Sequence, residues 1–120
     1  MKVYLVDGYV SSYAVVGNLR NSIEVEAPSD MAHFEANYMA YKLIDGALVF
    51  DSQKGEEILE EELKKELRRR RKTECFAIVD RSKLWYDTLT SQQYQELRAW
   101  YDAWLSVTET KVIPTKPEWL

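Results

Sequence analysis

The first fifty residues show strand-forming runs of apolar residues broken by tight-turn dipeptides. Such runs lie on both sides of Asp7-Gly8 and of Asp45-Gly46. An Asp-Gly pair readily supplies the two positive φ angles of a two-residue hairpin loop. Residues 22–26 alternate apolar with acidic side chains, as in a half-buried strand, and Ser29-Asp30 can cap a short helix. The pattern predicts a small antiparallel sheet of four or five strands within residues 1–52.

The second half of the chain has a helical pattern. No glycine or proline occurs in residues 56–113, so both strong helix breakers are absent. Apolar residues at steps of three and four predict one nearly continuous helix over residues 53–87. Thr90 and Gln93 form a capping box that opens a second helix over residues 91–108.

These elements define an α+β protein of three segments. A β-rich N-terminal region, 1–52, precedes a helical region, 53–113, in which the long charged helix and the second helix form an αα-hairpin. An extended, Pro-rich tail, 114–120, ends in Trp119-Leu120. A terminal Trp-Leu pair exposes much apolar surface if it is loose in water, so we expect the tail to dock.

The long helix separates its charges. Acidic residues dominate 56–62 and basic residues dominate 64–72, and i,i+4 pairs join them in the favoured order. One interpretation is a solvated helix that stabilises itself. The other is a seam for a second, antiparallel copy, with Leu59, Leu63 and Leu67 as its self-association residues and the two charge blocks facing each other. Both interpretations remain open on the sequence alone.

The composition argues against several functional classes. The net charge of −4 and the absence of aromatics within the basic run 68–72 argue against nucleic-acid binding. Cys75 is the only cysteine and falls on the apolar stripe, which excludes an internal disulfide and a thiolate zinc site. His33 is the only histidine and has no nucleophile motif beside it, so we interpret it as structural. We therefore predict no catalytic, cofactor-binding or metal-binding residues, and no window is apolar enough to cross a membrane.

Aromatic residues are concentrated near the C-terminus. Trp100 lies to one side of the predicted inner stripe, and Trp119 lies in the tail with Pro114 and Pro117. These four residues form either an intramolecular pocket with its plug or an anchor for a partner, because tryptophan is common at interface hot spots. We name them as the candidate partner-binding residues.

The C-terminal stretch resembles the corresponding region of small proteins from tailed bacteriophages and prophages, including tail-fibre assembly chaperones. The similar positions are Leu89-Thr90, Glu96-Leu97, Trp100-Tyr101, Val107–Thr110 and Pro114–Trp119. The stretch that contains them, residues 89–110 and 114–120, covers about a quarter of the chain. The resemblance implies a non-enzymatic protein that binds a tail or tail-fibre polypeptide, in the bacterial host cytoplasm during assembly or in the virion tail.

The N-terminal region is similar to small prophage proteins of Gram-positive bacteria, on the motifs around Asp7-Gly8 and Asp45-Gly46. Tail-fibre assembly chaperones more often carry a different N-terminal region. The alternative implied by the resemblance is therefore a structural or adaptor component of the tail or baseplate without chaperone activity.

Overall fold

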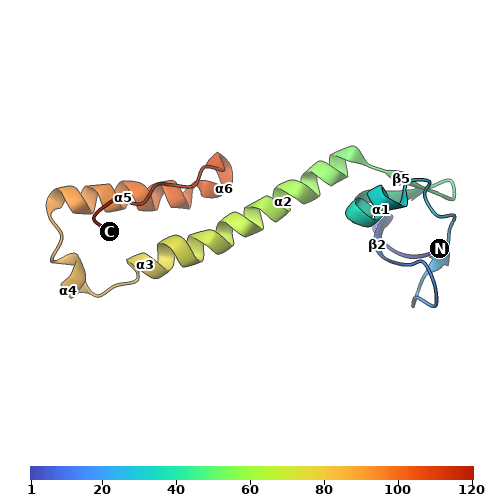
Figure 1. Cartoon of the computed structure of the whole chain (residues 1–120), viewed down its shortest axis with the longest axis horizontal. Coiled ribbons are helices and arrows are strands. Elements are labelled where there is room, and N and C mark those ends of the chain that lie inside the picture. Colours follow the sequence, from blue (N-terminus) through green and yellow to red (C-terminus); the bar gives the residue numbers. More distant parts are fainter. The chain divides into compact units, whose positions relative to one another are not determined.

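The computed structural model describes residues 1–120 and divides the chain into two compact units (Figure 1). We call Met1–Glu60 the N-terminal unit and Glu61–Leu120 the helical unit. The first contains an antiparallel sheet and the second contains only helices and the tail. This arrangement confirms the α+β class.

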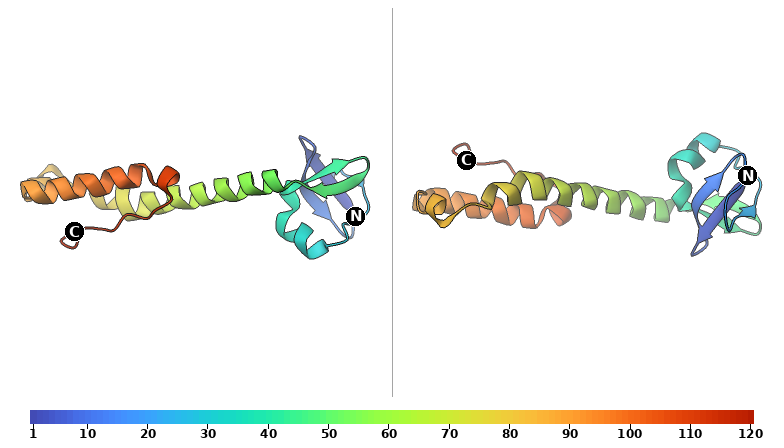
Figure 2. Two further views of the ribbon diagram at one scale, coloured as in Figure 1. Left: turned by 90° about the horizontal axis from the view of Figure 1, so that it is seen from above. Right: turned by 90° about the horizontal axis from the view of Figure 1, so that it is seen from below.

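The sheet of the N-terminal unit has five antiparallel strands in the order β3-β1-β2-β4-β5 (Figure 2). Both predicted hairpin loops are confirmed, because Asp7-Gly8 and Asp45-Gly46 all have positive φ angles. The register of the first hairpin shifts between Tyr4 and Leu5, as at a β-bulge. The strands are β1 (Lys2–Val6), β2 (Tyr9–Ala14), β3 (Ile23–Glu24), β4 (Tyr41–Ile44) and β5 (Ala47–Phe50).

One face of this sheet is covered by α1 (Met31–Asn37), which continues into the short helix η1 (Tyr38–Ala40). Asp30 caps α1, as expected, by accepting a hydrogen bond of 3.1 Å from the backbone N–H of His33. Phe34 projects from α1 into the core and is fully buried. The buried residues around it are Val3, Val10, Val25 and Tyr41.

His33 has the structural surroundings that the sequence indicated. Its Nδ1 lies 2.6 Å from the hydroxyl oxygen of Tyr41, and its ring meets that of Phe50 edge-on at 4.6 Å. These contacts join α1 to strands β4 and β5. The imidazole is therefore part of the packing between helix and sheet.

Asp51 connects the sheet to α2 (Ser52–Arg71). Its carboxylate accepts hydrogen bonds from the Tyr9 hydroxyl at 2.7 Å and from the backbone N–H of Lys54 at 3.1 Å, and the second bond caps the helix. Gly55 follows in the first turns, and a Cβ there would lie 3.1 Å from the Phe50 ring. Because Gly55 has no side chain, α2 can begin close to β5.

We expect the charge of Asp51 to make the stability of the N-terminal unit depend on pH. The Tyr9 hydrogen bond, and then the Lys54 N–H, hold the pKa of this carboxyl below its ordinary value of 3.8. A lowered folded-state pKa gives stability that is complete above the unfolded value and is lost as the pH falls through the folded value. Thermal unfolding of the wild type should therefore lose more stability below about pH 3.8 than that of Asp51→Asn, which keeps a capping side chain without the charge. Parallel pH profiles for the two proteins would contradict this expectation.

The long helix ends earlier than predicted. After α2 the helix continues through the π-helical turn η2 (Lys72–Phe76) and α3 (Ala77–Val79), and α4 (Lys83–Tyr86) is a separate turn. The prediction of one helix to residue 87 is wrong because Asp80 leaves the helical region at ψ 73° and Ser82 caps α4. The Tyr86 hydroxyl also donates a 2.6 Å hydrogen bond to the Val79 carbonyl oxygen, which satisfies a group at the helix end.

The second predicted helix is confirmed with a small break near its end. It consists of α5 (Ser91–Leu105) and α6 (Val107–Thr110), and the Thr90–Gln93 capping box is formed in both directions. The helices of this unit enclose a core that is separate from that of the sheet. Its buried members are Leu67, Cys75, Leu97, Trp100, Trp104 and Val107.

Candidate protein-interaction sites

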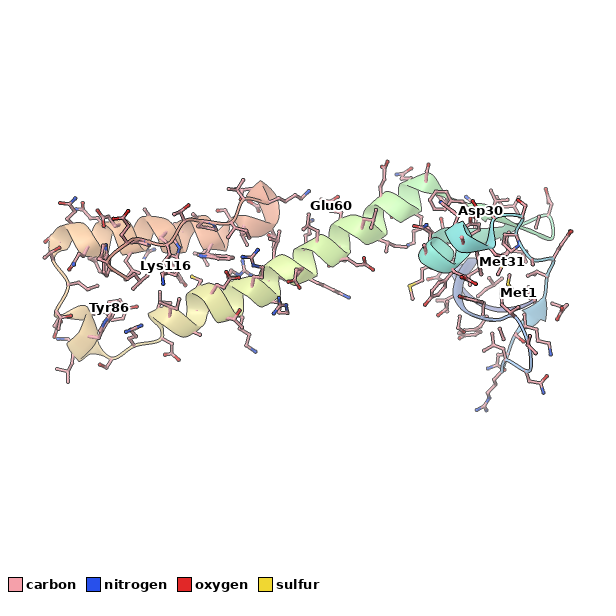
Figure 3. All side chains as sticks on the ribbon, in the orientation of Figure 1. Met1, Asp30, Met31, Glu60, Tyr86 and Lys116 are labelled. Carbon is pink, nitrogen blue, oxygen red and sulfur yellow. The ribbon has the colours of Figure 1, made fainter.

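The C-terminal tail docks on the helices of its own unit. The indole Nε1 of Trp119 donates a 2.7 Å hydrogen bond to Oε2 of Glu96 on α5. Ile113, Trp119 and Leu120 pack against the helical core. In Figure 3 the tail runs beside α5, with Lys116 labelled on it. The expectation that the terminal Trp-Leu pair docks is therefore confirmed.

Two of the residues predicted to make intermolecular contacts are buried instead. Trp100 is only 5% exposed, and Leu67 is equally covered, in the core that both share with Trp104. The expectation that they lie on a contact surface is wrong, because α5 turns Trp100 inward and the same core covers Leu67. Pro114 is half-buried and lines a cavity of about 340 Å³ with Trp100 and Trp104.

The tail therefore lies on the helices of its own unit, with Pro114 beside Trp100 and Trp119 beside Glu96. Pro117 and Trp119 are also half-buried, in the same tail. The indole N–H groups of Trp100 and Trp104 are buried with no acceptor, so no hydrogen bond joins them to the tail. Apolar packing and the Trp119–Glu96 hydrogen bond hold the tail on these helices.

The other two candidate self-association residues remain on the surface of α2. Leu59 is 63% exposed and Leu63 is 43% exposed. They are four residues apart on one helix and so lie on the same face. The helix therefore presents two adjacent leucines to solvent.

An open groove on the helical unit was not predicted from the sequence. It lies between α3, α4 and α5 and has a volume of about 580 Å³. Three tyrosines contribute to its wall, and Figure 3 shows one of them, Tyr86, projecting from α4. We call it the tyrosine groove; its lining residues are Val79, Lys83, Tyr86, Tyr94, Leu97, Arg98 and Tyr101.

The polar groups of the tyrosine groove are held in place by neighbours. Arg98 lies 3.3 Å from a carboxylate oxygen of Asp102, and Lys83 Nζ lies 3.0 Å from Asp87. Burial is the main cause that raises the pKa of Tyr86 above its ordinary value, with a smaller contribution from Tyr94. The groove therefore combines aromatic hydroxyls with cations whose charge is partly balanced.

Both walls of this groove had a partial signal in the sequence. Tyr94, Leu97 and Tyr101 follow steps of three and four, which placed them on one helix face. Tyr94 nevertheless remains 49% exposed, in the wall of the open groove. Tyr86 fell on the apolar stripe of the predicted long helix, but it lies on the separate turn α4, so the groove itself was not predicted.

The basic run is engaged by acidic neighbours and by backbone. Arg68 lies 3.3 Å from Glu61, and Arg69 Nε lies 2.9 Å from Glu66. Arg70 forms a bidentate salt bridge with Glu74. Arg71 Nη1 donates a 3.3 Å hydrogen bond to the Leu105 carbonyl oxygen. These pairs balance part of the positive charge of the run locally.

Cys75 is fully buried in the helical core, as its position on the stripe indicated. Burial raises the pKa of its thiol to about 11, and the nearby Arg71 lowers it by less. Since the thiolate is the reactive form, we expect a thiol reagent at neutral pH to label native protein slowly and unfolded protein fast. Reaction of the native thiol as fast as that of the unfolded chain would contradict this burial.

The structure has no group of three or more His, Cys, Asp or Glu side chains placed to hold a metal ion. None of its helices combines the length and apolar character needed to cross a membrane.

Comparison with known protein families gives a match to the N-terminal part of the chain. Residues 1–57 are similar to a family described as a protein of unknown function (DUF2977). The matched stretch contains the whole sheet and the first residues of α2. No curated protein and no solved structure matches the chain.

Proposed function

We propose that this chain is a non-enzymatic protein that binds a tail or tail-fibre polypeptide of a bacteriophage, and that the tyrosine groove holds part of that partner. The observation that carries the proposal is the groove itself, an open aromatic-lined hollow on the helical unit. Its α5 wall lies in the stretch that resembles phage tail proteins. The groove and the resemblance therefore fall on the same segment of the chain.

The chemistry of the groove suits a polypeptide partner. Tyrosine offers a large contact area, loses little conformational entropy on binding and carries a hydroxyl for hydrogen bonds. Tyrosine and arginine are also enriched at interface hot spots. Because Lys83 and Arg98 are each paired with an aspartate, the groove favours an apolar or aromatic segment with backbone acceptors over a bare polyanion.

Co-purification with the tail and tail-fibre polypeptides of the same bacteriophage tests this proposal. Tyr94→Ala and Arg98→Ala remove exposed groove side chains, and we expect each to weaken capture roughly tenfold, the size of a hot spot of about 1.4 kcal/mol. Tyr4→Ala is the matched control, since Tyr4 is an exposed tyrosine on β1 in the other unit. Equal capture by Tyr94→Ala, Arg98→Ala and the wild type would exclude the groove.

Mass spectrometry of purified phage particles distinguishes an assembly chaperone from a structural component or adaptor of the tail. An assembly chaperone leaves the finished tail, so its peptides should be absent from particles while they are present in infected cells. A structural component or adaptor should instead remain at a fixed ratio to the tail proteins. Absence of the protein from both particles and tail-assembly intermediates would contradict both forms.

A further inference from the structure

We propose that the tail and the tyrosine groove are coupled through α4, so that a docked Trp119 holds α4 in the position that forms the groove. The coupling is a property of the helical unit alone, and its effect on partner capture rests on the proposed function. The helix α4 belongs to both places, because Tyr86 lines the groove and Trp85 lines a second cavity at the tail.

The second cavity lies where the tail meets α4 and α5. It has a volume of about 290 Å³, and Trp119 and Leu120 of the tail contribute to its wall. Trp85 contributes from α4 and packs, like the two tail residues, against the helical core. The other lining residues are Arg81, Thr88, Leu89 and Gln93. The end of the tail and α4 therefore lie beside each other on one apolar region.

The helix α5 carries the tail and the groove on neighbouring faces. Gln93 lines the tail cavity, Glu96 accepts the Trp119 hydrogen bond, and Trp100 lines the cavity beside Pro114. Successive residues of a helix are about 100° apart, so the residues next to these in sequence point to the adjacent face. That face forms one wall of the groove, with Tyr94, Leu97, Arg98 and Tyr101.

The helix α4 spans the boundary between these two faces. Trp85 and Tyr86 are consecutive, and their rings meet edge-on at 4.9 Å. The Arg81 guanidinium lies 4.6 Å from the centre of the Trp85 ring on the tail side. On the groove side, the Tyr86 hydroxyl is hydrogen-bonded to the Val79 carbonyl oxygen at 2.6 Å. A movement of Trp85 therefore moves the groove wall that Tyr86 forms.

The position of α4 depends on its neighbours. It has four residues, Lys83–Tyr86, and lies between non-helical stretches at 80–82 and 87–90. A helix this short is not stable by itself, so packing must hold it. Loss of the tail contact should therefore let α4 open locally while the rest of the unit stays folded. By linkage, a partner that holds Tyr86 in the groove should also favour the docked tail.

Hydrogen exchange of the full chain without a partner tests the coupling. The backbone N–H groups of residues 85–89 are all hydrogen-bonded, at 2.9–3.3 Å, so their exchange reports the opening of α4. In Trp119→Ala, which loses the indole and its hydrogen bond to Glu96, these amides should exchange roughly tenfold faster than in the wild type. The amides of α5 should keep their protection.

Three further variants serve as controls. Val112→Ala changes a side chain that is 66% exposed and should exchange like the wild type. Glu96→Ala removes the acceptor from the other side of the Trp119 hydrogen bond and should also speed exchange at 85–89. Glu96→Gln keeps an oxygen that can accept this bond and should stay close to the wild type.

Two results of this experiment would overturn the coupling. One is unchanged exchange at residues 85–89 in Trp119→Ala. The other is equal acceleration in α4 and α5, because this would show a general loss of stability in place of a local opening.

Co-purification with tail polypeptides tests the effect on capture. Trp119→Ala should weaken capture several-fold, and the Trp119→Ala/Tyr94→Ala protein should lose less than the product of the two single losses, because both act through one groove. Losses that multiply would show that Trp119 does not act through the groove. Failure of the wild type to capture any tail polypeptide would count against the proposed function, whereas exchange at residues 85–89 decides the coupling in either case.

Discussion

Replacing Trp104 by alanine is expected to lower the free energy of unfolding of the helical unit by about 3–5 kcal/mol. Trp104 is 1% exposed and is the largest fully buried side chain of the chain. Its truncation leaves a cavity in a core of only six buried residues, which cannot collapse fully. A small protein is stable by about 5–15 kcal/mol, so this loss is a large share of the total.

Urea unfolding followed by far-ultraviolet circular dichroism measures this effect, since most helices belong to this unit. Leu84→Ala is the control, because a 79% exposed leucine should change stability by about 0.5 kcal/mol or less. A Trp104→Ala protein as stable as Leu84→Ala would show that the indole is not part of a packed core.

Replacing Phe34 by alanine is expected to destabilise the N-terminal unit by a similar amount, about 3–5 kcal/mol. Phe34 is fully buried, and its ring meets those of Tyr13 at 4.9 Å and Tyr41 at 5.0 Å, both edge-on. Edge-to-face contacts add to the apolar area lost on truncation. The helix α1 would then lose its main contact with the sheet.

Hydrogen exchange resolves where this loss occurs. The amides of β1, β2 and β4 should lose protection in Phe34→Ala, while those of α5 should keep it, because the two hydrophobic cores share no residue. Equal loss of protection in α5 would contradict the independence of the two cores. Met39→Ala, at an exposed position of the same unit, should leave both sets of amides protected.

Local signals predicted the elements whose geometry depends on neighbouring residues alone. Asp7-Gly8 and Asp45-Gly46 form their turns because both residue types tolerate positive φ angles. This property does not depend on the neighbouring strands. The capping box at Thr90 and the cap at Asp30 likewise depend on groups within three residues. In these places the pattern in the sequence was sufficient.

Prediction failed at a helix break that the apolar spacing overran and at the burial of one tryptophan. Apolar spacing continued the long helix to residue 87, but Ser82 and the hydroxyl of Tyr86 favour a break after Val79. Trp100 fell beside the predicted stripe, yet it is buried because the core extends to both sides of α5. Both errors come from side-chain contacts that periodicity does not contain.

The same distinction applies to the candidate sites. The exposed leucines of α2 could be identified from spacing, because a narrow stripe within dense charge is visible along one helix. The tyrosine groove combines side chains from three helices, so it becomes visible only when the helix break is known. The sequence identified the tail residues as apolar anchors, and in the structure the tail packs against helices of the same chain.

Photocross-linking at Tyr94 in phage-producing cells tests whether the tyrosine groove holds a tail polypeptide. A benzophenone amino acid replaces Tyr94 on the groove wall in one protein and Tyr4 on the sheet in the control. Position 94 should cross-link to a tail or tail-fibre polypeptide that mass spectrometry identifies, and position 4 should not. Cross-links from position 94 that contain no tail polypeptide, or the same products from both positions, would contradict the proposed function.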